Sequence, residues 1–142
     1  MKFTCSIVIN QSRAKIVEFF SKTEYQHHFQ DGFISKTLLS GTEGENGSTS
    51  KMVYKRLELI ETVLENNLPD SFYALYEHKH TTNTMRITFT ELNENSTQYD
   101  SEIHYTKFNG FIINALVKLF PGMFKKQVLK WMKQFKEFAE NN

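Results

Sequence analysis

Apolar and polar residues alternate over the first ten positions of the chain, which predicts a β-strand with one apolar face. That face would carry Phe3, Cys5, Ile7 and Ile9. Ser12 follows, and we expect it to cap a helix, because its hydroxyl can accept a hydrogen bond from an amide two or three residues on. The helix would bury residues that recur at helical spacing, namely Ile16, Phe19 and Phe20. A second short helix is expected over Glu24–Phe29.

Between Phe33 and Phe108 the alternation returns and predicts six more strands. These are Phe33–Ser40, Thr49–Lys55, Leu57–Asn66, Phe72–His80, Met85–Leu92 and Gln98–Lys107. Most of the junctions contain turn-forming residues, such as the loop Gly41–Gly47. Short turns join antiparallel neighbours, so the segment predicts an antiparallel sheet.

The alternation also suggests a register for the last hairpin of this sheet. If Asn93 pairs with Thr97, the apolar residues of both strands share one face. The facing pairs would then be Phe89 with Ser101, Ile87 with Ile103 and Met85 with Tyr105. In the preceding hairpin the same argument places Tyr76 opposite Ile87, although Tyr73 and Leu75 compete with Phe72, Ala74 and Tyr76 for the inner face.

The chain ends in a long amphipathic pattern from Phe124 to Ala139, with lysines on the other side, which predicts a helix. Pro121 and Gly122 should separate it from a shorter helix over Phe111–Phe120. The whole order predicts an α+β fold in one domain, residues 1–142. In it, a curved antiparallel sheet of about seven strands wraps around the C-terminal helix, with two short helices after the first strand.

This order resembles the START-like helix-grip fold of the SRPBCC superfamily, which includes polyketide cyclases, birch-pollen-type plant proteins and activators of a chaperone ATPase. Its carriers are the strand Phe3–Asn10, the segment Glu61–Tyr76 with its Leu68–Phe72 turn, and the closing segments Phe120–Lys126 and Phe135–Phe138. The resemblance covers Met1 to Glu140 and implies a fold with a hydrophobic pocket between sheet and helix, and little about chemistry.

The residues expected to point into that pocket are apolar and aromatic. They are Met52, Tyr54, Tyr76, Met85, Ile87, Phe89, Tyr99, Ile103, Tyr105, Phe120, Phe124, Val128, Trp131, Met132 and Phe135. A filled core is the alternative interpretation of the same residues. The pattern favours a pocket for a hydrophobic small molecule, a lipid or an aromatic metabolite, with tyrosine hydroxyls as polar anchors.

Composition and charge narrow the possible partners, metal sites and location of the protein. Seventeen Lys and Arg against sixteen Asp and Glu give a net charge of +1, which argues against a nucleic-acid partner. A single cysteine excludes an intramolecular disulfide and a multi-cysteine metal site.

The first residues lack the features of a secretion signal, so we expect a cytoplasmic protein. Six lysines and two glutamates after residue 110 make the C-terminal helices basic, which would suit contact with an anionic membrane, but covering the sheet is the preferred role.

Titratable residues offer few convincing chemical sites. His78 and His80 would share a strand face, but no third metal ligand converges on them, so we expect no metal or cofactor. Cys5 is expected to be buried and to act as a small hydrophobic residue. The Gly41–Gly47 loop is expected to be a hairpin loop at a pocket entrance. A row of Glu77, Arg86, Glu102 and His104 should lie on the outer face as a charge ladder.

The sequence therefore favours a ligand-binding protein, monomeric or homodimeric, over an enzyme. A cyclase or aromatase using the same pocket is the first alternative, with His78 and then Glu61 as candidate acid or base. A co-chaperone-like interaction protein is the second, and it would expose an apolar patch instead of enclosing a pocket.

Overall fold

The computed structural model describes all 142 residues and contains one seven-stranded antiparallel sheet in the order β1-β7-β6-β5-β4-β3-β2. The strands are β1 (Lys2–Ile9), β2 (Phe33–Ser40), β3 (Thr49–Tyr54), β4 (Glu58–Asn67), β5 (Ser71–Glu77), β6 (Thr81–Asn93) and β7 (Ser96–Phe108). The helices are α1 (Arg13–Ser21), the 3₁₀ helix η1 (Thr23–His28), α2 (Phe111–Leu119) and α3 (Met123–Glu140). This is the element order that the sequence predicts. β6 and β7 extend further at both ends than their alternating segments.

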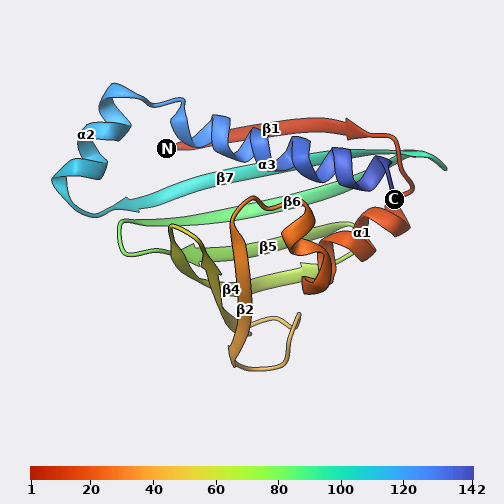
Figure 1. Ribbon diagram of the computed structural model, residues 1–142, viewed down its shortest axis with the longest axis horizontal. Helices are drawn as coiled ribbons and strands as arrows, with labels where there is room; N and C mark the ends of the chain where they lie inside the picture. The colour runs from red at the N-terminus through yellow and green to blue at the C-terminus, as the bar shows by residue number, and fades with distance from the viewer.

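Helix α3 lies along the concave face of the sheet, on the side of β1, β7 and β6 (Figure 1). Its apolar side buries Met132, Phe135 and Ala139. Helix α1 covers the end of the sheet nearest the C-terminus, while α2 extends beyond the opposite end (Figure 1). Ser12 caps α1 as predicted, since its hydroxyl oxygen accepts a hydrogen bond from the Lys15 amide at 3.3 Å. No helix of this fold combines the length and apolar character needed to cross a bilayer.

The strand registers differ from the predicted ones by an even number of residues. Phe89 pairs with Tyr99 and not with Ser101, because Asn93 pairs with Ser96 in a tight turn and a bulge lies between Glu91 and Asn93. In the preceding hairpin Tyr76 pairs with Asn83 and not with Ile87, since the chain already turns after His78, whose amide donates to the Thr81 carbonyl. An even shift leaves every side chain on its predicted face, so the inner face is right although the pairs are wrong.

Two aromatic residues do not take the positions that the sequence predicts for them. Phe89 is 1% exposed and packs in the core beneath α1, with its ring 5.5 Å from that of Phe20 and 5.2 Å from that of Tyr99. Phe120 lies just after α2 and is 59% exposed. Neither lines the space between sheet and helix, because α1 closes one end of that space and α2 bends away from the other.

The buried position of Phe89 and the exposed position of Phe120 predict very different losses of stability for the same substitution. Phe89→Ala should lower the free energy of unfolding by about 3–5 kcal/mol, the usual cost of removing a buried ring. Phe120→Ala should change it by less than about 0.5 kcal/mol. Urea denaturation followed by circular dichroism measures both. Equal effects would contradict the placement, and Phe89→Leu offers a milder test if the alanine variant does not fold.

Candidate ligand-binding site

A cavity of about 440 Å³ lies between the concave face of the sheet and α3. Thirteen of the fifteen residues predicted for a pocket lie on its wall, and Phe89 and Phe120 are the two that do not. The thirteen are Met52, Tyr54, Tyr76, Met85, Ile87, Tyr99, Ile103, Tyr105, Phe124, Val128, Trp131, Met132 and Phe135. That these residues hold a ligand stays a prediction.

Most of the wall is apolar, for a reason that lies in the strand alternation. Met85 and Ile87 on β6 and Ile103 on β7 point inward at every second position. From the other side α3 contributes Val128 and Trp131, and the indole of Trp131 stacks on the Tyr54 ring with the ring centres 5.9 Å apart. A wall of this kind favours the apolar part of a ligand.

One polar row crosses this apolar face. Its members are cross-strand neighbours from β3 to β7, and all of them line the cavity: Ser50, Glu61, Tyr76, Asn83 and Tyr105. The next row towards α1 is apolar and consists of Val63, Ala74, Met85 and Ile103. The cavity therefore has a polar line within an apolar surface.

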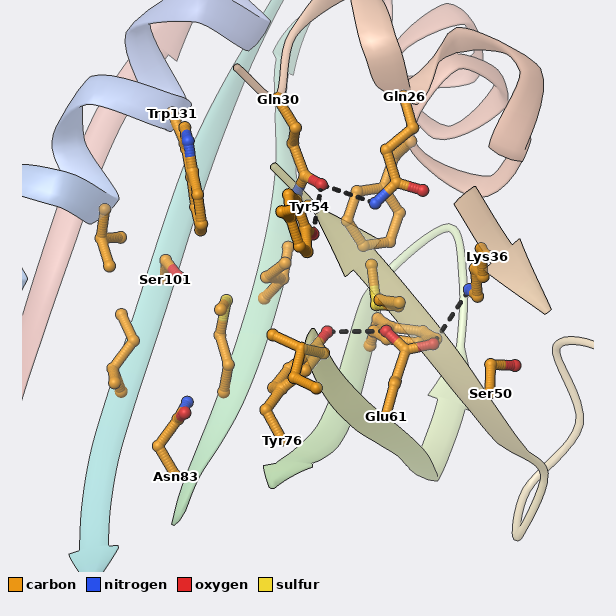
Figure 2. A pocket seen from close by; sticks show the side chains of 18 of the residues that line it. Gln26, Gln30, Lys36, Ser50, Tyr54, Glu61, Tyr76, Asn83, Ser101 and Trp131 are labelled. Carbon is orange, nitrogen blue, oxygen red and sulfur yellow. Dashed lines mark hydrogen bonds and ion pairs between the residues drawn. The ribbon is translucent and has the colours of Figure 1, made fainter. Parts of the chain in front are cut away.

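Glu61 is the one charged member of the polar row. It is also the only charged residue of the chain that is buried, at 5% exposure. One carboxylate oxygen, Oε2, accepts a hydrogen bond from the Tyr76 hydroxyl at 2.8 Å. The other, Oε1, lies 2.9 Å from Nζ of Lys36, which reaches across from β2 (Figure 2). Both carboxylate oxygens are thus engaged, and the Lys36 ammonium compensates the buried charge.

A second polar group borders the cavity at η1. The Tyr54 hydroxyl donates to the side-chain oxygen of Gln30 at 2.7 Å, and the Gln26 amide donates to the same oxygen at 2.6 Å (Figure 2). These bonds fix the Tyr54 ring that stacks on Trp131.

Burial keeps the cavity tyrosines in their neutral form. It raises the pKa of Tyr54, Tyr76 and Tyr99, and that of Tyr105 to about 12. The Glu61 carboxylate raises the pKa of Tyr76 further. At neutral pH these phenols are therefore uncharged hydrogen-bonding groups.

Two hydrogen-bond donors on the cavity wall have no partner in the protein. They are the hydroxyl of Ser101, a residue with no exposed surface, and Nε1 of Trp131. Both side chains lie on the side of the cavity opposite Glu61 (Figure 2). A buried polar group without a partner is costly, and because neither atom has accessible surface, a bound molecule could accept from it only if the wall shifts locally.

Sequence patterns identify the tyrosines of the polar wall but not its other members. They indicate Glu61 only as the second candidate acid or base, and they do not indicate Lys36, Ser50, Asn83 or Ser101 as pocket residues. Strand alternation could have identified Asn83, because it lies two positions before Met85 and so on the same face. Its position next to a turn made it look like a loop residue instead. Lys36 reaches the cavity from an edge strand that is mostly exposed, which alternation cannot reveal.

The histidines and the cysteine that were considered for chemistry show no catalytic or metal-binding arrangement. His78 and His80 both line the cavity rim with their rings 5.5 Å apart, and burial lowers the pKa of His78. No three His, Cys, Asp or Glu side chains converge to hold a metal ion. Cys5 is buried in the core at 2% exposure.

The loop between β2 and β3 reaches the edge of the cavity through Glu43 and Gly44. Gly41 takes a φ of +80°, and a Cβ there would lie 3.0 Å from Cα of Ser48, so this turn requires glycine. The Asn66 side-chain amide donates to the Gly44 carbonyl at 2.7 Å and ties the loop to β4. The loop borders the cavity, as expected of a hairpin at its entrance.

The predicted charge ladder lies on the outer face. Arg86 pairs with Glu102 across the strands, His104 pairs with Thr84, and Glu77 pairs with Thr82. The Arg86 guanidinium lies 3.3 Å from the Glu65 carboxylate and 4.1 Å from the centre of the Tyr73 ring. These groups face away from the cavity.

Comparisons with known proteins place the fold. No protein-family model matches the chain, and no curated protein matches it in sequence. Among solved structures, a conserved protein from Geobacillus kaustophilus superposes with a TM-score of 0.79 at 14% identity, covering 99% of this chain and 96% of the other. A START superfamily protein from Mycobacterium smegmatis gives 0.72 at 13% identity, with coverages of 99% and 97%. A truncated norcoclaurine synthase from Thalictrum flavum gives 0.73 at 11%, with coverages of 100% and 94%.

These likenesses show that the chain has the START-like helix-grip fold that the sequence predicts. At such identities they establish the fold alone.

The unpartnered hydroxyl of Ser101 leads to a prediction that separates stability from binding. Without added ligand, Ser101→Ala should raise the free energy of unfolding by about 1 kcal/mol, because it removes a buried donor that has no partner. The same substitution should weaken a ligand whose acceptor meets that hydroxyl. Thermal melts with and without ligand measure both effects. A destabilised variant without ligand would show that the hydroxyl is satisfied in the free protein.

Proposed function

We propose that the protein binds an amphipathic small molecule, with an apolar body and at least one polar group, between the sheet and α3. The observation that carries the proposal is the 440 Å³ cavity whose apolar wall is crossed by one buried polar row. A lipid or an aromatic metabolite with a hydroxyl or carbonyl group has this character. The START-like fold supports the same conclusion by analogy, because proteins with this fold bind small hydrophobic molecules.

The cavity is too large to be empty in a stable protein. At about 24 cal/mol per Å³, a dry cavity of this volume would cost about 10 kcal/mol. The total stability of a domain is only about 5–15 kcal/mol. Water could hydrogen-bond to the polar row but not to Met85, Ile87 or Ile103, so an apolar group is the better occupant of that part.

The polar groups define how the ligand would lie. Its apolar body would fill the space between Ile103 on the sheet and Val128 and Trp131 on α3. A polar group would reach the row at Tyr76 and Asn83, and an acceptor would meet Ser101. Desolvation of apolar surface would supply most of the affinity, and the polar row would supply orientation.

Filling the cavity with a bulkier side chain tests this proposal. The neutral dye N-phenylnaphthylamine should bind the protein, brighten, and accept excitation energy from Trp131, the single tryptophan of the chain. Val128→Trp should weaken dye binding at least about tenfold, because the indole occupies the space that the dye needs.

The matched control is Leu39→Trp, which adds the same ring at a residue that is 54% exposed on β2. It should bind the dye as well as the parent protein does. Failure of the parent protein to bind any apolar dye, or equal binding by Val128→Trp, would contradict the proposal.

An enzyme acting by proton transfer in the same cavity is a second candidate, and the buried Glu61 favours it. Its carboxylate faces the cavity, and Tyr76 and Lys36 hold it in place. A carboxylate fixed in an apolar site is suited to accept a proton from a carbon next to a carbonyl group. That one similar structure is a synthase agrees with this candidate without establishing it.

Isotope exchange tests the second candidate. The protein should accelerate exchange of the protons next to the carbonyl of 2-tetralone in D₂O, as followed by NMR. Glu61→Gln should lower that acceleration by about 100-fold or more, since it removes the base while keeping its shape. Glu102→Gln, on the outer face of β7, serves as the control. Equal rates in the parent protein and in Glu61→Gln would exclude Glu61 as the base.

A further inference from the structure

Helix α2 is apolar on both sides, and one of its sides is covered by nothing. Ile113, Leu116 and Val117 are half-buried and turn towards the protein. The opposite stripe carries Phe111, Ile112, Ala115 and Leu119, all exposed, with Phe111 at 84%, Ile112 at 66% and Leu119 at 71%. Only Asn114 and Lys118 interrupt the apolar surface of α2, and an exposed apolar stripe of this size is typical of a surface that meets a partner.

The stripe continues beyond the helix and lies at one end of the cavity. Phe120 and Met123 follow α2 and are also exposed. Ile113 of α2 and Phe124 of α3 line the cavity, and the Phe124 ring packs 4.7 Å from that of Tyr105. Helix α2 extends beyond the end of the sheet (Figure 1), and Ile113 on its inner side lines the cavity, so a surface that covers its outer side would lie next to this end of the cavity.

The charge around α2 has one sign. Residues 103–136 contain seven lysines and no aspartate or glutamate. Lys107, Lys118, Lys125 and Lys126 are exposed around α2 and the start of α3, and none of them forms an ion pair. An apolar stripe surrounded by unpaired lysines matches a surface that is apolar inside and anionic outside, which is the interface of an acidic lipid bilayer.

We propose that α2 docks on the surface of an anionic lipid bilayer and brings this end of the cavity to the membrane, where an amphipathic ligand can enter or leave. Docking itself stands on the surface of α2, whereas ligand exchange rests on the proposed binding function. A second copy of the chain is a poorer partner, because a symmetric contact through α2 would bring the lysines of both copies together. No span of the bilayer is implied, since the helix would lie in the interface.

Co-sedimentation with vesicles tests docking. The protein should bind vesicles of 70% phosphatidylcholine and 30% phosphatidylserine, and bind pure phosphatidylcholine much more weakly. Ile112→Asn/Leu119→Asn should lower the partition coefficient at least about tenfold, because both residues would enter the interface. Each of Lys118→Gln and Lys125→Gln should lower it about fivefold on the acidic vesicles only.

The control is Ile34→Asn/Leu39→Asn, which replaces two apolar residues of similar exposure, 59% and 54%, on β2 away from α2. It should bind vesicles like the parent protein. Absence of binding to acidic vesicles at low salt, or equal binding by the α2 variant, would overturn the proposal. Sedimentation velocity showing a dimer that the α2 variant loses would also overturn it in favour of a second copy.

The dye assay separates this inference from the proposed function. An α2 variant that binds N-phenylnaphthylamine normally but no vesicles supports docking through α2 alongside an intact cavity. A parent protein that binds vesicles but no dye would refute the ligand-binding function while docking stands. Dye binding without vesicle binding in the parent protein would refute the docking.

Discussion

The structure depends on a mismatch between the width of its sheet and the helix that covers it. Seven strands at about 4.8 Å spacing span about 29 Å, whereas a helix with its side chains is about 10–12 Å across. Helix α3 therefore covers the side of β1, β7 and β6, and α1 covers one end. The rest of the concave surface borders a cavity instead of a packed layer, and residues from β3 to β7 line it.

The polar groups on that surface are easier to explain by binding than by stability. A buried ion pair such as Lys36 with Glu61 contributes little net stability, because desolvation offsets most of its attraction. The same pair, with Tyr76 donating to the carboxylate, gives a fixed polar point in an apolar space. Ser101 and Trp131 add donors that no protein atom satisfies. An arrangement that costs stability in the free protein is what the proposed binding of a small molecule in the cavity would explain.

Sequence patterns predict the element order and the inner faces of β1, β6 and β7, because both follow from local periodicity, but they leave the inner face of β5 open between two sets of apolar residues. They did not predict the pairing register, since Asn93 pairs with Ser96 through a turn and a bulge whose geometry alternation does not encode. Phe89 and Phe120 were placed in the pocket because an apolar residue on the right face looks the same whether it meets a cavity, a neighbouring helix or solvent. The Lys36–Glu61 contact joins two strands that are not neighbours in the sheet, so no short-range pattern announces it.

Native mass spectrometry of freshly purified protein would show whether the cavity holds an amphipathic molecule. We expect a retained compound of lipid or aromatic character with a hydroxyl or carbonyl group, which is released on denaturation and is lost from the Val128→Trp variant. A protein whose mass is bare, and which also takes up no compound of this kind when one is added, would refute ligand binding in this cavity. The concave surface would then be filled by movement of its own side chains.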